Sequence, residues 1–206
     1  DDDVKTLVHW IEAGSPRGDG PDPLAVPREP LKDWPLGQPD QIIALPAFTV
    51  PASGVVDYQY PVIENPLTEG KWLKATTVKV GSRETVHHVL SGHVKEMPKN
   101  GRSGQINWGP SVGGYAVGAE SNIAREGMGT YIPAGGGFGF QMHYTTYGKE
   151  VTDITEIGLY FYDEGEKPKQ MIRNMNLADI SIKIPPTNSK TACINFTFKT
   201  PIAINN

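Results

Sequence analysis

Apolar residues follow two different periods along the chain, one before and one after about residue 40. Near the N-terminus they recur at the three- and four-residue spacing of a helix, at Val4, Leu7, Val8 and Ile11. Gly14 then supplies a stop signal, so we predict one short helix over residues 3–14. From residue 41 onward, apolar positions alternate or form short runs bounded by turn residues, which is typical of strands.

The second part of the chain is predicted to be all strand and turn. The predicted strands cover residues 42–45, 55–62, 72–80, 84–94, 138–144, 154–162, 180–184 and 191–198. Residues 95–135 are rich in glycine and are expected to form a long functional or packed loop. The expected fold class is all-β, an antiparallel, jelly-roll-like β-sandwich that follows one short helix and a linker.

Residues 14–40 are dense in Pro, Gly and Asp, which favours a linker over a regular element. We therefore expect a helix and linker over 1–38 and a β-sandwich domain over 39–168. Residues 169–206 are expected to be the opening strands of a second, truncated sandwich. The acidic start of the chain is expected to be a processed or trimmed end.

Composition narrows the classes of function. Of 206 residues 38% are hydrophobic, which is enough for a packed core, and 23 Gly and 18 Pro favour turns. The net charge of −4 and the lack of a Lys/Arg block argue against a nucleic-acid partner. The sequence has no run of about 18 apolar residues, so no membrane-spanning segment is predicted. The single Cys193 excludes an internal disulfide, a Cys-rich zinc site and an iron–sulfur cluster.

Histidines are the candidate chemistry of this chain. Three of the five lie in two short apolar segments, His87 and His88 in one and His143 in the other. Imidazole suits copper and zinc, and three neutral imidazoles form a half-open metal site. Neighbouring residues on a regular strand point to opposite faces, so His87 and His88 need a bulge, a strand end or different ring nitrogens to share an ion. Alternatively, His87 and His93 share a face and His88 bonds a backbone carbonyl.

These segments also resemble a known family. The similarity lies in Thr85-Val86-His87-His88-Val89-Leu90, Ile132-Pro133-Ala134-Gly135 and Gln141-Met142-His143-Tyr144. They resemble the N-terminal domain of the copper type II, ascorbate-dependent monooxygenases, which include peptidylglycine α-hydroxylating monooxygenase and dopamine β-monooxygenase. Residues 7–19 resemble the closing helix of a c-type cytochrome, and 34–40 the entry to the copper domain, as in bacterial relatives. The likeness covers most of residues 1–185.

The resemblance implies that His87, His88 and His143 bind one electron-transfer copper ion. It further implies ascorbate or a c-type cytochrome domain or subunit as electron donor, a hydroxylation reaction, and a periplasmic or extracellular location. Gln141 and Tyr144 flank the third histidine and are candidates for fixing its tautomer, although both are also ordinary strand residues.

Two other residues are not expected to bind the metal. Met142 has its side chain on the strand face opposite to His143 and is expected in the core. His9 is expected to be an exposed helix residue.

The chain also departs from the family. The second copper site of the family uses a His-x-His pair and a methionine, but this chain has no His-x-His and no histidine after His143. It also lacks the Cys-x-x-Cys-His haem attachment of a cytochrome. We therefore expect one copper ion and no hydroxylation by this chain alone. Two alternatives remain open: a non-catalytic structural or accessory subunit of a larger extracellular or redox assembly, and a zinc hydrolase with Glu84 or Glu96 as base.

Overall fold

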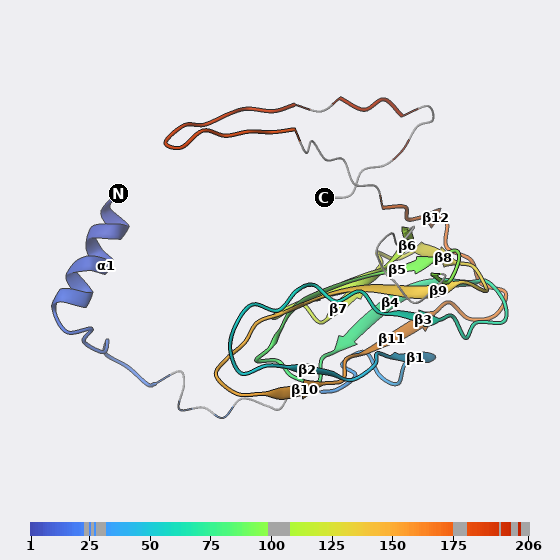
Figure 1. The fold of residues 1–206 in the computed structure, drawn as a ribbon, viewed down its shortest axis with the longest axis horizontal. Helices are drawn as coiled ribbons and strands as arrows, with labels where there is room; N and C mark the ends of the chain where they lie inside the picture. The colour runs from blue at the N-terminus through green and yellow to red at the C-terminus, as the bar shows by residue number, and fades with distance from the viewer. Residues whose placement is uncertain are drawn as a thin grey trace. The chain divides into compact units, whose positions relative to one another are not determined.

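The chain forms two compact units, Asp1–Asp33 and Trp34–Asn206. The computed structural model describes residues 1–22, 25, 27, 32–98, 108–174, 181–193, 195–198 and 202. In this part of the chain, the first unit contains the helix α1 and the second contains the strands (Figure 1).

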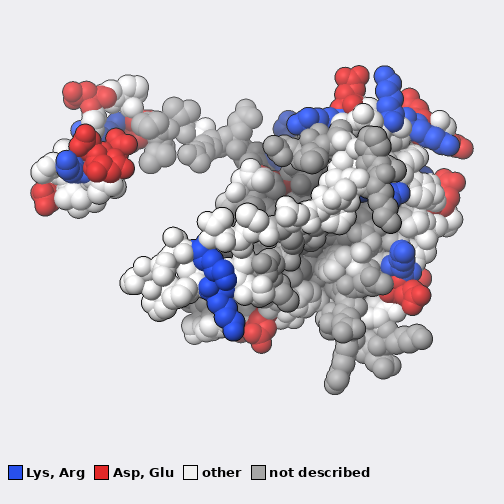
Figure 2. Space-filling view, turned by 90° about the horizontal axis from the view of Figure 1, so that it is seen from above, with Lys and Arg blue, Asp and Glu red and all other residues white. Residues whose placement is uncertain are grey.

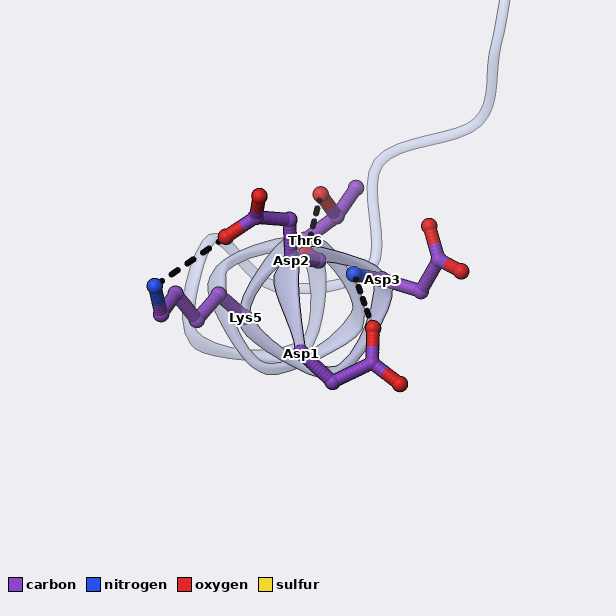
Figure 3. A network of polar contacts seen from close by, with 5 residues as sticks. All are labelled: Asp1, Asp2, Asp3, Lys5 and Thr6. Atoms are coloured by element: carbon purple, nitrogen blue, oxygen red, sulfur yellow. Dashed lines mark hydrogen bonds and ion pairs between the residues drawn. The ribbon is translucent and has the colours of Figure 1, made fainter.

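Helix α1 spans Asp2–Glu12, which confirms the predicted helix. Its first turn is fixed by polar contacts (Figure 3). The Asp1 side chain caps the helix by accepting a hydrogen bond from the backbone N–H of Asp3 at 3.1 Å, and Lys5 pairs with Asp2 at 3.1 Å. None of the helix residues is buried. Among the described residues, no helix has the length and apolar character needed to cross a membrane.

The second unit is a sandwich of mostly antiparallel sheets, which confirms the all-β prediction. Its strands are β1 (Gln41–Ala44), β2 (Phe48–Val50), β3 (Val62–Glu64), β4 (Lys71–Lys79), β5 (Val86–Val94), β6 (Trp108–Ala116), β7 (Ser121–Ile123), β8 (Met128–Ile132), β9 (Gly137–Tyr144), β10 (Val151–Asp153), β11 (Glu156–Phe161) and β12 (Gln170–Met171). One sheet has the order β1-β11-β4-β8-β12, with β7 also paired to β4, and the other has the order β3-β9-β5-β6. A small third sheet pairs β10 with β2.

The core joins side chains from both main sheets. On β9, Phe138, Phe140 and Met142 are at most 1% exposed, as expected for alternate residues on one face of a strand. They belong to the same buried cluster as Ile157 and Leu159 of β11 in the other sheet. Each fully buried side chain of this size contributes about 1.5–3 kcal/mol of hydrophobic stabilisation. The prediction that Met142 belongs to the core is confirmed.

Residues 95–135 do not form the predicted long loop. Where this segment is described, it contains β6, β7 and β8. Strand β6 was not predicted because its segment is rich in glycine, which is generally disfavoured in strands. Here glycine permits close strand pairing: a Cβ atom on Gly114 would lie 2.7 Å from the carbonyl oxygen of Val89 on β5. The glycines therefore mark a tight strand contact in this sheet.

Other strand predictions were also wrong. Residues 55–62 form only an isolated bridge between Gln59 and Met142 before β3 begins at Val62. The described parts of 180–184 and 191–198 contain no strand, while Ile180 and Ile194 lie outside the described residues. Alternating polarity is not sufficient for a strand, because the backbone N–H and C=O groups also need a neighbouring strand. The short strands β2, β10 and β12 were not predicted, because two or three residues are too few to show a strand pattern.

Acidic and basic side chains lie near one another at the surface, as Figure 2 shows for one face. Lys79 and Glu156 face each other on paired strands with a 3.2 Å ion pair, and Arg83 pairs with Glu120 at 2.7 Å. Partly exposed pairs of this kind contribute at most about 1 kcal/mol each. They support the strand register but do not determine it.

Candidate metal centre

The three predicted histidines meet at the ends of the paired strands β5 and β9. Val86 pairs with Tyr144, and the next pair is His88 with His143, so β5 advances two residues while β9 advances one. His87 is therefore the extra residue of a β-bulge. A bulge breaks the alternation that would otherwise point His87 and His88 to opposite faces. The sequence predicted that such a device was needed, and the register supplies it.

The structure brings all three imidazole rings together. The Nδ1 atom of His88 lies 3.1 Å from Nδ1 of His87 and 3.3 Å from Nδ1 of His143. One ligand nitrogen from each ring lies within 4.8 Å of the others. The ring planes are steeply inclined to one another, at 68° for His87–His88, 61° for His87–His143 and 71° for His88–His143. The nitrogens therefore face a common small volume from three directions.

The spacing of these nitrogens fits a metal ion. A zinc ion lies about 2.0–2.1 Å from an imidazole nitrogen that binds it. Two such nitrogens at roughly tetrahedral angles are therefore about 3.1–3.6 Å apart. The two shortest contacts, 3.1 and 3.3 Å, lie in this interval. Hydrogen bonding does not explain the group as well, because Nδ1 of His88 has either one proton or one lone pair for two neighbouring nitrogens. A cation bound between the rings would accept a lone pair from each of the three nitrogens.

The surroundings favour the neutral, ligating form of His88. Burial lowers the pKa of His88, and the nearby His143 and His87 lower it further because two imidazolium charges repel. A side-chain hydrogen bond with Gln141 acts in the opposite direction. Metal binding requires neutral imidazole, so the net effect reduces proton competition. His87 is exposed while His88 and His143 are half-buried, so the group is open to solvent on one side.

Tyr58 is a neighbour of the site that the sequence did not identify. Its ring stacks on that of His143, with centroids 4.6 Å apart and planes at 27°, and lies 5.9 Å from the His88 ring. The position follows from the bridge between Gln59 and Met142, whose backbones bond in both directions at 3.1 and 2.8 Å. This antiparallel bridge places Tyr58 beside His143. Only the strand register could have revealed this, because the two residues lie far apart in the sequence.

Gln141 and Tyr144 have different roles from each other. The side-chain amide of Gln141 donates to the Tyr60 hydroxyl at 3.4 Å and also interacts with His88. Tyr144 is buried on the core side of β9, and its hydroxyl donates to Asp153 at 3.0 Å. Burial, with the charge of Asp153, raises the pKa of Tyr144 strongly, so this hydroxyl keeps its proton and remains a donor. Its proton is thus used in the core and not at the His143 ring.

The other histidines lie outside the group. His93 is 2% exposed, and its Nε2–H donates to the carbonyl oxygen of Gly135 at 2.9 Å. The Nδ1 atom of His88 contacts the His87 and His143 rings, and these contacts do not support the alternative in which His88 bonds a backbone carbonyl. His9 is exposed on α1, 3.4 Å from Glu12, as predicted.

Only histidines form this group among the described residues. Glu84, a candidate base for hydrolysis, accepts a hydrogen bond from the Ser82 hydroxyl at 3.2 Å, and Glu96 is exposed and not part of the group. Three imidazoles without a carboxylate or thiolate suit copper or zinc. No protein-family model matches this chain, and no curated protein sequence matches it.

Proposed function

We propose that His87, His88 and His143 hold one copper ion and that the chain serves as an electron-transfer domain. The observation that carries the proposal is the convergence of three imidazole nitrogens at a β-bulge, with Nδ1 separations of 3.1 and 3.3 Å. Copper is favoured over zinc because nitrogen ligands bind Cu²⁺ more strongly. When bound, copper supplies one-electron redox chemistry, and three neutral nitrogen donors accommodate both of its oxidation states.

The protein residues have distinct parts in this proposal. The bulge at His87 lets neighbouring ligands from one strand serve a single ion, while His143 comes from the adjacent strand. Stacking on Tyr58 restricts the His143 ring, and Gln141 interacts with His88. The exposed His87 leaves a solvent-facing side through which a donor can approach. Rigid ligands with one open side suit electron exchange with a partner.

The wider proposal is that this domain belongs to a secreted or periplasmic copper monooxygenase-like protein. Its support is the resemblance of the His-His and Gln-Met-His-Tyr segments together with their meeting in space. Ascorbate or a c-type cytochrome is the proposed electron donor. Hydroxylation needs a second copper site, and this sequence has no His-x-His pair to form one. That site is proposed to lie in another domain or subunit.

Metal analysis and electron paramagnetic resonance (EPR) test this function. We expect about one copper per chain after loading and dialysis, and a Cu(II) signal with nitrogen hyperfine structure, because three imidazoles bind the ion. Ascorbate or a reduced c-type cytochrome should abolish the signal, and air should restore it. A chain that retains copper but exchanges no electrons would support the accessory alternative. A chain that retains zinc in preference to copper would contradict the copper proposal.

A further inference from the structure

We infer that Tyr144 and Asp153 are positioning residues that hold the β-bulge at His87 in its ligand-binding shape. The inference rests on the proposed function, because it concerns the geometry of the same three histidines. Tyr144 is adjacent to His143 in the chain, and it pairs with Val86, which immediately precedes His87. The pair Val86–Tyr144 is thus the last regular pair before the bulge.

Asp153 is a buried carboxylate that accepts three hydrogen bonds. It is 1% exposed and lies at the end of β10. Its Oδ1 accepts the backbone N–H of Ser82 at 2.9 Å. Its Oδ2 accepts the hydroxyl of Tyr144 at 3.0 Å and that of Thr155 at 2.8 Å. Bonds to a buried charged group are stronger than neutral ones, so this carboxylate fixes its neighbours firmly.

Two of these donors belong to the segments that carry the histidines. Ser82 starts the turn that leads into β5, where its carbonyl oxygen accepts the backbone N–H of Val86 at 3.0 Å. Tyr144 ends β9 directly after His143. The next residue, Thr145, donates its backbone N–H to the carbonyl oxygen of Thr85 at 2.7 Å. One carboxylate therefore ties the entry of β5 to the end of β9, on the side of the bulge opposite to the ligands.

This connection sets the relative position of the two strands where the metal geometry is most sensitive to it. A bulge leaves its extra residue unpaired and disrupts the ladder locally, so His87 and His88 need another constraint to keep their orientation. Metal ligands must be held within about 0.5 Å of their working positions. Without the Tyr144 hydroxyl, β9 loses its bond to the carboxylate that also anchors β5. The His88–His143 separation is then expected to change.

The test is Tyr144→Phe, compared with Tyr160→Phe as a matched control. Tyr160 is also buried, at 7% exposure, and its hydroxyl donates to the carbonyl oxygen of Gly37 at 2.9 Å, away from the histidines. We expect Tyr144→Phe to weaken copper binding about 10–100-fold in a competition titration, as loss of ligand-orienting groups typically does. The copper hyperfine splitting should also change. Tyr160→Phe should leave both unchanged. Equal copper affinities and spectra in the two variants would overturn the inference.

A second variant separates positioning from loss of stability. Thr155→Val removes a donor from the same oxygen of Asp153 but leaves the bonds to Ser82 and Tyr144 in place. We expect Thr155→Val to lower the melting temperature without altering the copper spectrum. If Thr155→Val changed the copper spectrum as much as Tyr144→Phe does, the carboxylate would act through stability only.

Metal-free protein provides an independent readout. In Tyr144→Phe, the ring NMR signals of His88 and His143 should shift, whereas those of His93 should not. Unshifted signals for His88 and His143 would contradict the inference without reference to copper. Failure of the unaltered protein to bind copper would instead contradict the proposed function. The two failures are therefore distinguishable.

Discussion

Replacing His143 with alanine is expected to abolish stoichiometric copper binding while leaving the sandwich folded. His143 supplies the only donor from β9, and its Nδ1 lies 3.3 Å from that of His88. Without it, two neighbouring histidines of one strand remain. The loss should exceed the roughly 10–100-fold effect of removing a residue that only orients a ligand. The measurement is copper content per chain after dialysis, with far-UV circular dichroism to monitor the fold.

His9→Ala is the matched control for this variant. His9 is exposed on α1, so its replacement removes an imidazole of the same kind from the first unit. It should retain about as much copper as the unaltered protein. The half-buried His143 ring lies outside the core, so the alanine variant should lose only about 0.5–1 kcal/mol of folding free energy. Copper at 100 times its dissociation constant should stabilise the unaltered protein by about 2.7 kcal/mol and the His143 variant much less. Unchanged copper content in His143→Ala would contradict the site assignment.

The histidine site shows how far sequence reasoning reached. Two adjacent imidazoles between apolar residues predicted a special strand geometry, because alternation alone could not satisfy a shared ion. The bulge at His87 is that geometry. The contact that we infer to hold this bulge could not be predicted, because Ser82 and Asp153 are 71 residues apart in the sequence. Their hydrogen bond, at 2.9 Å, exists only once the turn before β5 meets the end of β10.

The errors in the fold prediction have a related physical origin. Local propensity identified β4, β5, β9 and β11, whose residues are β-branched or apolar. It missed β6 because the glycines of this strand allow close contact with β5. Such a contact depends on the tertiary structure and cannot be predicted from local propensity. It also predicted strands at 180–184 and 191–198, where alternation is present but the described residues have no strand partner. Patterns within a segment indicate what it can form, and pairing decides what it forms.

Gly136→Ala is expected to be the most destabilising small substitution at the other end of β5. Gly136 has φ +67°, and a Cβ atom there would overlap the carbonyl oxygen of Val94 and lie 2.8 Å from that of Lys95. Both contacts are with backbone, which cannot move aside as a flexible side chain can. The left-handed conformation costs an alanine about 1–2 kcal/mol. Relief of the overlap adds about 1–3 kcal/mol. Urea denaturation should therefore show a loss of about 2–5 kcal/mol.

Gly135→Ala is the control, because Gly135 has a similar φ of +72° but no atom within 4 Å of the added Cβ. It should lose only the conformational cost of about 1–2 kcal/mol. Equal losses in the two variants would show that the overlap with Val94 is relieved without cost. The ligands lie near the start of β5, roughly 20 Å from Val94 at 3.3 Å per residue. Folded Gly136→Ala should therefore bind copper with unchanged affinity, because the residues that hold the strand pair together at this end are not those that orient the histidines.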